Sequence, residues 1–344
     1  MSVLLRTFAA GVVAASALLT AGSASGDAIE DFFKGKTVTY YISTVPGGCY
    51  DLYGRFVAMY IGKHIPGNPS LVPKNMPGAG GLTLANWLYN VAPRDGTAIA
   101  GPPQALAIEQ VLGSKGIQYD AAKFTWIGRS APVVEVMYTW HTSPTKTFND
   151  AQSRETIMGG TGPTSPTITY LKQLNILAGT KFKPISGFGG TTEVNLAMER
   201  GEVEGSIKSW ASMKVDNPDW LRNHTVNIIL QFALDKPADL PDVPLMTEIG
   251  STEANSQALK FFAYGNAMGR ATFGPPGMAA DRVKALRTAF MAMSKDPDFL
   301  AEAEKRKIDI GPLDGEGLQR IVEETLAVSE QVKARALEAR AASE

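Results

Sequence analysis

Apolar and polar positions alternate along the chain with two periods, one typical of strands and one typical of helices. Runs rich in β-branched and aromatic residues predict strands at 36–43, 69–76, 95–101, 131–140, 226–234 and at the starts of 153–166 and 182–205. Helical periodicity covers 51–64, 166–178, 279–294 and the later parts of 78–92 and 182–205. Strands that alternate with helices in this way are typical of an α/β fold with a largely parallel sheet.

Details of the pattern refine four of these elements. Two helices have an apolar face at helical spacing, formed in 51–64 by Leu52, Phe56, Met59 and Tyr60 and in 279–294 by Val283, Leu286, Phe290 and Met293. Pro73 cannot donate to a ladder, so strand 69–76 is expected near a sheet edge. Thr191 or Thr192 is expected to cap the helix within 182–205, and Gly201 to end it.

The last residues, from Gly317, alternate glutamate with lysine and arginine around a narrow apolar stripe. This pattern predicts a charged surface helix. The stripe could pack on the chain's own domain, which we favour, or against a coiled-coil partner.

The first residues have the layout of a secretory signal peptide. Arg6 precedes a stretch of small and aliphatic residues, and small residues follow around Ser23 to Gly26, so cleavage is expected near Ser25 to Ala28. A membrane anchor is the alternative, but the stretch is short for a span and lacks a flanking cluster of charges. We therefore expect an exported protein in the periplasm, with residues 1–26 removed.

Composition excludes some partners and one kind of stabilisation. The chain has 344 residues, 44% hydrophobic and 19% charged, with a formal net charge of −1. A nucleic-acid partner would call for a basic face, so none is expected. Cys49 is the single cysteine and cannot form an internal disulfide, so the fold must depend on its core.

Glycine-rich loops are the strongest candidate binding elements. There are four, at Pro46–Gly48, Gly78–Gly81, Gly159–Gly162 and Gly187–Gly190, each between a predicted strand and a predicted helix. Helix N-termini present unpaired N–H groups and partial positive charge, so several converging loops could hold a carboxylate without lysine or arginine. Each loop could instead be only a tight turn. None matches a nucleotide phosphate loop.

Catalytic and metal-binding readings have little support. Cys49 at a helix start could be a nucleophile, but it would need a base, and His64, His141 and His224 are not at a telling spacing. Cys49 is better interpreted as a small residue lining a pocket. Metal-binding motifs are missing from the sequence. We expect no metal site, no cofactor and no enzymatic activity, and we interpret Asp51 as a cap or first-turn acid of its helix.

An ordered set of motifs resembles one family. VPGGCYDLYGR, PKNMPGAGGL, NVAPRDGT, GFGGTTEVNLAMERGEVEG, LPDVPLMTEIG and FGPPGMAADRVKALRTAF follow the order and spacing of the periplasmic substrate-binding proteins of tripartite tricarboxylate transporters, the Bug receptors. The resemblance runs from about Phe32 to Leu326. It implies a two-lobed, type II periplasmic-binding-protein fold, with a mostly parallel sheet flanked by helices in each lobe and a ligand cleft between the lobes.

The resemblance also implies a domain division and a function. After the signal peptide, lobe 1 would cover 27–130 and 258–344, with the C-terminal helix, and lobe 2 would cover 131–257. The protein would close over a small organic acid, such as a di- or tricarboxylate or an aromatic acid, and deliver it to integral-membrane transporter subunits. We expect a monomer. A ligand-sensing partner of a membrane kinase and a secreted hydrolase are the alternatives.

Candidate site residues follow by carrying the family's motifs onto this sequence. In the first lobe they are Gly47, Gly48, Cys49, Tyr50, Ala79 and Gly80. In the second lobe they are Thr161, Thr164, Ser165, Gly189, Gly190 and Thr191, with Ser209 and Trp210 on the far wall. The sequence departs from the family at Cys49-Tyr50 and at GGTGPTSP. Tyr50 and Trp210 could favour a flat acid or could simply pack, so the departures leave the ligand open.

Overall fold

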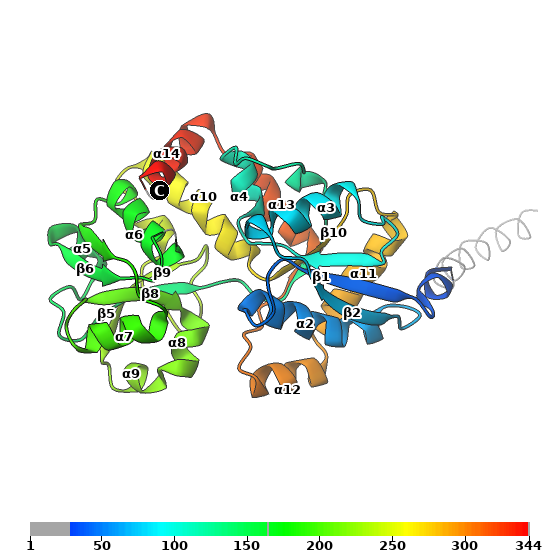
Figure 1. Cartoon of the computed structure of the whole chain (residues 1–344), viewed down its shortest axis with the longest axis horizontal. Coiled ribbons are helices and arrows are strands. Elements are labelled where there is room, and N and C mark those ends of the chain that lie inside the picture. Colours follow the sequence, from blue (N-terminus) through cyan, green and yellow to red (C-terminus); the bar gives the residue numbers. More distant parts are fainter. Residues whose placement is uncertain (1–27, 164, 343–344) are drawn as a thin grey trace, which may run out of the picture.

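The structure is a computed structural model that describes residues 28–163 and 165–342. The expected signal peptide and Thr164 lie outside the described residues. The described chain forms two α/β lobes side by side, each built around its own sheet (Figure 1). The two-lobed α/β fold expected from the sequence is confirmed.

The first lobe has a sheet with strand order β11-β4-β10-β3-β1-β2 among the described residues. Its strands are β1 (Thr37–Ile42), β2 (Ser70–Asn75), β3 (Ala98–Gly101), β4 (Thr125–Arg129), β10 (Ala271–Gly274) and β11 (Leu313–Asp314). Its helices are α2 (Cys49–Ile61), α3 (Leu82–Asn90), α4 (Leu106–Val111), α11 (Ala280–Met293), α12 (Pro297–Lys305) and α13 (Gly315–Leu326). Strand β2 lies at the sheet edge, as Pro73 predicts.

The second lobe has a sheet with strand order β7-β6-β8-β5-β9. Its strands are β5 (Glu135–Trp140), β6 (Thr156–Gly159), β7 (Phe182–Ile185), β8 (Gly205–Ser209) and β9 (Val226–Phe232). Its helices are α5 (Phe148–Ser153), α6 (Pro166–Leu177), α7 (Thr191–Glu199), α8 (Trp210–Asp216) and α9 (Pro218–Arg222). Short 3-10 turns occur at η1 (Gly62–His64), η2 (Ala79–Gly81), η3 (Ala121–Lys123) and η4 (Met246–Glu248).

Both sheets are mixed rather than mostly parallel, which corrects one detail of the expected fold. Strand β1 is parallel to β2 and β3, but β10 is antiparallel to β3 and β4. In the second lobe, β6 is parallel to β7 and β8, but β5 is antiparallel to β8 and β9. The reason is the path of the chain. Strands β5 and β10 enter their lobes from the crossing between lobes, whereas β1, β3, β6 and β8 run toward it.

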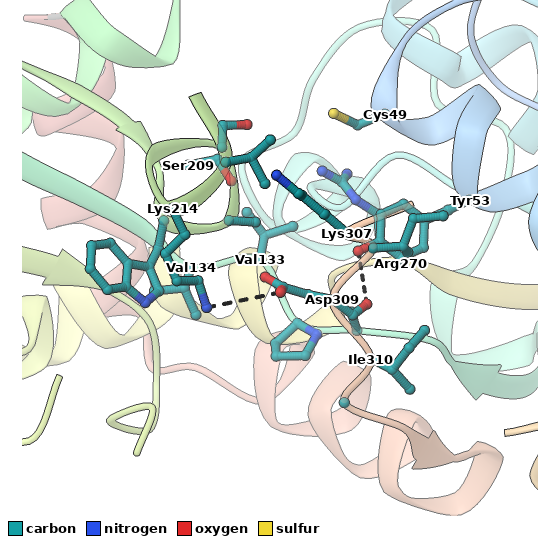
Figure 2. Close-up of a pocket in the computed structure, with 18 of the residues that line it drawn as sticks. Cys49, Tyr53, Val133, Val134, Ser209, Lys214, Arg270, Lys307, Asp309 and Ile310 are labelled. Carbon is teal, nitrogen blue, oxygen red and sulfur yellow. Dashed lines mark hydrogen bonds and ion pairs between the residues drawn. The ribbon is translucent and has the colours of Figure 1, made fainter. Parts of the chain in front are cut away.

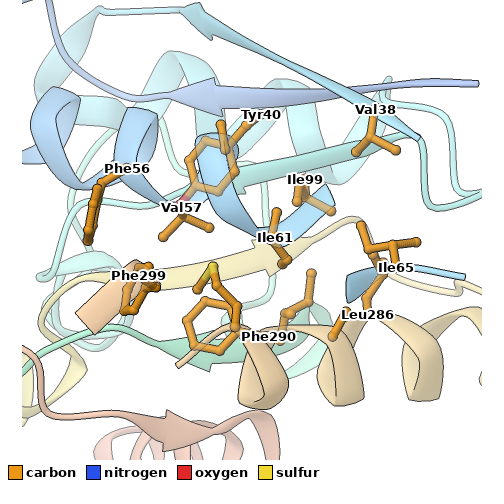
Figure 3. Close-up of a cluster of buried hydrophobic side chains, with 14 of the residues drawn as sticks. Val38, Tyr40, Phe56, Val57, Ile61, Ile65, Ile99, Leu286, Phe290 and Phe299 are labelled. Carbon is orange, nitrogen blue, oxygen red and sulfur yellow. The ribbon is translucent and has the colours of Figure 1, made fainter. Parts of the chain in front are cut away.

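Helix α2 packs on one face of the first sheet, and its N-terminus faces the other lobe. Phe56, Val57 and Ile61 pack with Val38 and Tyr40 of β1 and with Phe290 of α11 (Figure 3). Gly54 allows this close approach, because a Cβ there would lie 2.7 Å from the Ile42 side chain. The buried face of α2 runs through Gly54, Val57 and Ile61, so Leu52 is 41% exposed and Met59 59% exposed. Their predicted place on the buried face is wrong.

Two further helices join the lobes at the top of Figure 1. Helix α10 (Glu253–Met268) contributes Leu259 to a hydrophobic core of the second lobe and Met268 to a hydrophobic core of the first lobe. The predicted C-terminal helix is two helices, α13 and α14 (Glu330–Ala341), and the Ser329 hydroxyl caps the second. Helix α14 packs on α10 and α6, so its apolar stripe is covered by the chain itself.

Candidate functional site

The loop between β1 and α2 is held by one buried carboxylate. The Gly47 N–H donates to Oδ2 of Asp51 at 3.0 Å, and the Arg55 Nε donates to the same oxygen at 2.9 Å. Asn75 Nδ2 donates to Oδ1 of Asp51 and to the Thr44 carbonyl, both at 2.8 Å. The hydrogen bonds from Arg55, and then those from Asn75 and Gly47, lower the pKa of Asp51 to about 2. Asp51 therefore shapes the first turn of α2, as expected.

This arrangement decides which loop groups could meet a ligand. The Gly47 N–H is already used by Asp51. The next N–H groups, from Gly48, Cys49 and Tyr50, lie at the start of α2, where no intrahelical acceptor is available. A Cβ on Gly48 would meet no atom within 4 Å, so the loop borders open space. An anion could approach the helix N-terminus there.

The second loop of the first lobe has an unusual backbone. Residues Gly78, Ala79, Gly80 and Gly81 all have positive φ, of 144°, 46°, 65° and 97°. The Gly81 N–H donates to the Gly78 carbonyl at 2.9 Å and closes the turn. Ala79 and Gly80 are exposed, and a Cβ on Gly80 would also meet nothing within 4 Å. The φ of Gly80 lies in the left-handed region that favours glycine.

The loops of the second lobe are held by a different set of contacts. The Gly189 N–H donates to Oε2 of the exposed Glu193 at 2.7 Å, and the Gly187 N–H donates to the Thr161 carbonyl at 2.6 Å. Ser165 Oγ donates to the Gly162 carbonyl at 2.7 Å. Helix α7 is capped by Gly190 without a side-chain bond. Thr191 and Thr192 follow it as the exposed first residues of the helix, so their predicted capping role is wrong.

A cavity of about 380 Å³ lies between the lobes (Figure 2). It is bounded by the start of α2, the crossing segment 131–134, the β8–α8 junction, Arg270 and the segment 306–311 after α12. Of the predicted site residues, Cys49, Ser209 and Trp210 line it. The other described ones do not line this cavity, and most are in the four glycine-rich loops described above.

The two aromatic residues left open by the sequence have clear structural roles. Trp210 is 7% exposed and packs in a hydrophobic cluster of the second lobe. Its Nε1 donates to Oδ2 of Asp239 at 2.9 Å. Tyr50 donates through its hydroxyl to Oε1 of Gln104 at 3.2 Å. Its ring lies under the Arg270 guanidinium, 4.3 Å from ring centroid to carbon. Both residues are thus held by protein contacts, and Trp210 also presents part of its surface to the cavity.

The cavity has several cationic groups in its lining. Lys214 of α8 pairs with Asp239 at 3.1 Å and, across the lobes, with Asp309 at 3.9 Å (Figure 2). The Tyr53 hydroxyl donates to the Asp309 carbonyl at 2.9 Å from the other side. Lys307 forms no ion pair with any described residue, and Arg270 has one buried Nη1 without a partner among them. The lining also contains the carboxylates of Asp216, Asp239 and Asp309, so Arg270 and Lys307 are the lining groups that could attract an anion.

Solved protein structures share this architecture. A TctC solute-binding protein from Polaromonas has a TM-score of 0.67 and 16% identity, over 88% of this chain and 98% of that chain. The chain has the fold of a solute-binding protein. An R. palustris protein solved with adipate has a TM-score of 0.59 and 19% identity, over 88% and 97% of the two chains. MatC from Rhodopseudomonas palustris, with bound malate, has a TM-score of 0.56 and 20% identity, over 87% and 99%.

Sequence comparison gives no such match. No protein-family model and no curated protein matches the chain. The likeness to solute-binding proteins is therefore a likeness of fold, and the identities are low enough for the ligand contacts to differ.

Cys49 lies in the cavity lining, and none of the described histidines lies there with it. His64 bonds Asp296 at 2.8 Å near the far end of α2, and His141 and His224 are exposed in the second lobe. The described residues contain no group of three or more side chains arranged to hold a metal ion. Among them, too, no helix has the length and apolar character needed to cross a bilayer.

Sequence reasoning missed the charged residues between the lobes. Arg270, Glu135 and Lys214 belong to no glycine-rich motif, so the search for loops passed over them. A signal does exist for two of them. Glu135 interrupts the apolar segment APVVEVMYTW, and Arg270 directly precedes the buried strand ATFG. A charged residue within or next to a buried strand must find a partner or a ligand.

Proposed function

We propose that this chain is an extracytoplasmic receptor that binds a small organic acid between its two lobes. The observation that carries the proposal is the interlobe cavity, in which Arg270 has a partner-free buried Nη1 beside the start of α2. A guanidinium and a helix N-terminus both favour a carboxylate. In this proposal the glycine-rich loops of both lobes close on the ligand, and the predicted site residues supply backbone and hydroxyl contacts.

The wider role follows from the resemblance and from the structural neighbours. Two of those proteins were solved with adipate and malate, which are small dicarboxylates. In this proposal the signal peptide exports the chain to the periplasm, where the monomeric receptor delivers its acid to membrane subunits of a tripartite tricarboxylate-type transporter. The proposal retains the division into lobe 1 (27–130 and 258–344) and lobe 2 (131–257), with closure about the crossing segment and α10.

A thermal-shift panel on the protein without residues 1–26 tests the receptor. The panel would contain C4 to C6 dicarboxylates, citrate, acidic amino acids and aromatic acids, with the matched amide of each acid as its control. An acid at 100 times its dissociation constant should raise the unfolding midpoint by roughly 5–10 °C, whereas its amide should not. If no acid raises the midpoint and none is released when the protein is denatured, the proposal is wrong.

A further inference from the structure

Six polar side chains from both lobes meet where the chain crosses between them. We call them the hinge cluster: Tyr50, Gln104, Glu135, Tyr170, Asn266 and Arg270. The Gln104 N–H donates to the Tyr50 hydroxyl at 3.0 Å, and Gln104 Nε2 donates to Oδ1 of Asn266 at 3.4 Å. The Tyr170 hydroxyl donates to the same oxygen at 3.3 Å. The uncharged members of the cluster thus bond one another across the lobes.

The two charged members, Glu135 and Arg270, each have a buried polar atom without a hydrogen-bond partner among the described residues. The Glu135 carboxylate forms no hydrogen bond or ion pair with any described residue, and its Oε2 is buried. The Arg270 guanidinium stacks on Tyr50 at 4.3 Å and lies 5.6 Å from the Tyr53 ring, yet its buried Nη1 has no acceptor. A buried polar atom without a partner is costly, and two of opposite charge in one cluster require a reason.

Their placement offers that reason. Arg270 lines the interlobe cavity, and Glu135 lies just behind the lining, next to Val134 in the chain and paired in the ladder with Ser209. Arg270 is close enough to lower the pKa of Glu135, but the two side chains do not form an ion pair. A ligand that carries both charges could satisfy both residues, whereas a plain dicarboxylate would place an anion beside Glu135.

We propose that the receptor selects a zwitterion of the amino-acid type, with its carboxylate on Arg270 and its ammonium group on Glu135. This inference rests on the proposed function and makes it more specific. Glu135 begins the first strand of the second lobe, and Arg270 precedes a strand of the first. A ligand held by both residues would therefore tie the two lobes together at the hinge.

The protonation state of Glu135 determines how ligand affinity should change with pH. Burial raises the pKa of Glu135 to about 7, and Arg270 only partly opposes this effect. The other groups that face it, Tyr50 and Tyr170, have pKa values raised by burial and stay neutral near pH 7. An ammonium group needs the ionised form of Glu135. Affinity should then rise about tenfold between pH 6 and pH 8, with release of a proton on binding.

The first experiment compares amino acids with their deaminated partners. Isothermal titration calorimetry would use aspartate against succinate, glutamate against glutarate, and phenylalanine against 3-phenylpropanoate, at pH 6, 7 and 8. The expected result is tighter binding of the amino acid in at least one pair, with affinity that rises with pH. Titrations in buffers of different ionisation enthalpy would count the released proton.

Variants separate the two charges. Glu135→Gln should weaken amino-acid binding roughly ten- to hundredfold, remove the pH dependence and leave the deaminated acid unaffected. Arg270→Gln should weaken both members of a pair, and Arg270→Lys should restore part of the binding if the charge is what counts. Glu155→Gln and Arg320→Gln make the same chemical changes at exposed positions and should change neither affinity.

Two other results would overturn the inference in different ways. If the deaminated acids bind more tightly and their affinity falls as pH rises, Glu135 acts as a protonated donor to a second carboxylate. The zwitterion is then wrong, but the receptor stands. If no member of any pair or of the acid panel binds, the proposed function itself fails.

Discussion

The two lobes use the same device to hold the glycine-rich loop at the start of a helix, but they build it differently. In the first lobe the Gly47 N–H donates to Asp51, and in the second the Gly189 N–H donates to Glu193, in both cases four residues later. Asp51 is buried and also accepts from Arg55 and Asn75. Glu193 is exposed, and Gly189 is its one hydrogen-bond donor among the described residues.

The difference indicates that the Gly47 loop is held more firmly than the Gly189 loop. A carboxylate with several charge-assisted bonds in a buried place fixes its loop before any ligand arrives. A single bond to an exposed glutamate costs little to break, because water can replace it. In the proposed site, the first lobe would therefore offer a prebuilt half, and the second lobe a half that can adjust to the ligand.

The largest expected effect comes from filling the prebuilt half. Gly80→Val places a side chain in open space at φ 65°, and we expect at least a hundredfold loss of affinity for the acid found by the panel. The strained backbone should cost about 1–2 kcal/mol of stability, so the protein should still fold. Circular dichroism and calorimetry would measure both.

Gly190→Val is the matched change in the adjustable half. Its φ of −176° is extended backbone that valine adopts without strain, and its Cβ also meets open space. We expect a loss of affinity of roughly tenfold, with stability unchanged. Equal losses at Gly80 and Gly190 would remove the distinction between the lobes, and full retention at Gly80 would place the ligand elsewhere.

Removal of the two carboxylates tests the same contrast through stability. Asp51→Ala leaves Arg55, Asn75 and the Gly47 N–H without their acceptor, so the free energy of unfolding should fall by about 2–3 kcal/mol. Glu193→Ala should lower it by less than about 0.5 kcal/mol, as for other exposed polar contacts. Urea unfolding measures both. A comparable loss for Glu193→Ala would contradict the picture.

The stability that Asp51 supplies should decrease in acid. The pKa of Asp51 is lowered from 3.8 to about 2, so the stability it supplies is complete above the unfolded value and disappears as pH falls through the folded one. The stability difference between wild type and Asp51→Asn should therefore shrink between pH 5 and pH 2. Urea midpoints at each pH would measure this difference, and a difference that stays constant over the range would contradict the role of Asp51.

Much of the fold could be predicted from the sequence, because the signals for strands, turns and helices are local. β-branched runs, glycine turns and helical periodicity depend on neighbouring residues, so β1, β9 and α11 lie within the segments predicted for them. The exposed side of α2 was not predictable in this way, since its buried face runs through Gly54 and leaves Leu52 and Met59 exposed. Distant packing decides which face of a helix is buried.

The site residues differ in the same way, since some have a local sequence signal and others do not. The glycine-rich loops carry their own signature in the sequence, and Cys49, directly after the first of them, lines the cavity. The hinge cluster has none, because Tyr50, Glu135 and Arg270 are far apart in sequence and meet only when both sheets have formed. The use of the Gly47 N–H by Asp51 was also hidden, since a first-turn acid has the same sequence whether it faces solvent or the loop.

The smallest effect is expected at the residue that first suggests chemistry. Cys49 is exposed at the prebuilt edge of the cavity, and no histidine lines that cavity. Cys49→Ala should change ligand affinity less than about threefold, because alanine suits the helix start and the backbone N–H remains. Bound ligand should still slow alkylation of Cys49 in the wild type, since the thiol lies in the cavity lining. Turnover of a ligand that vanishes in Cys49→Ala would replace the receptor by an enzyme, whereas unchanged affinity with ligand-protected Cys49 would place the acid beside the helix N-terminus of the first lobe.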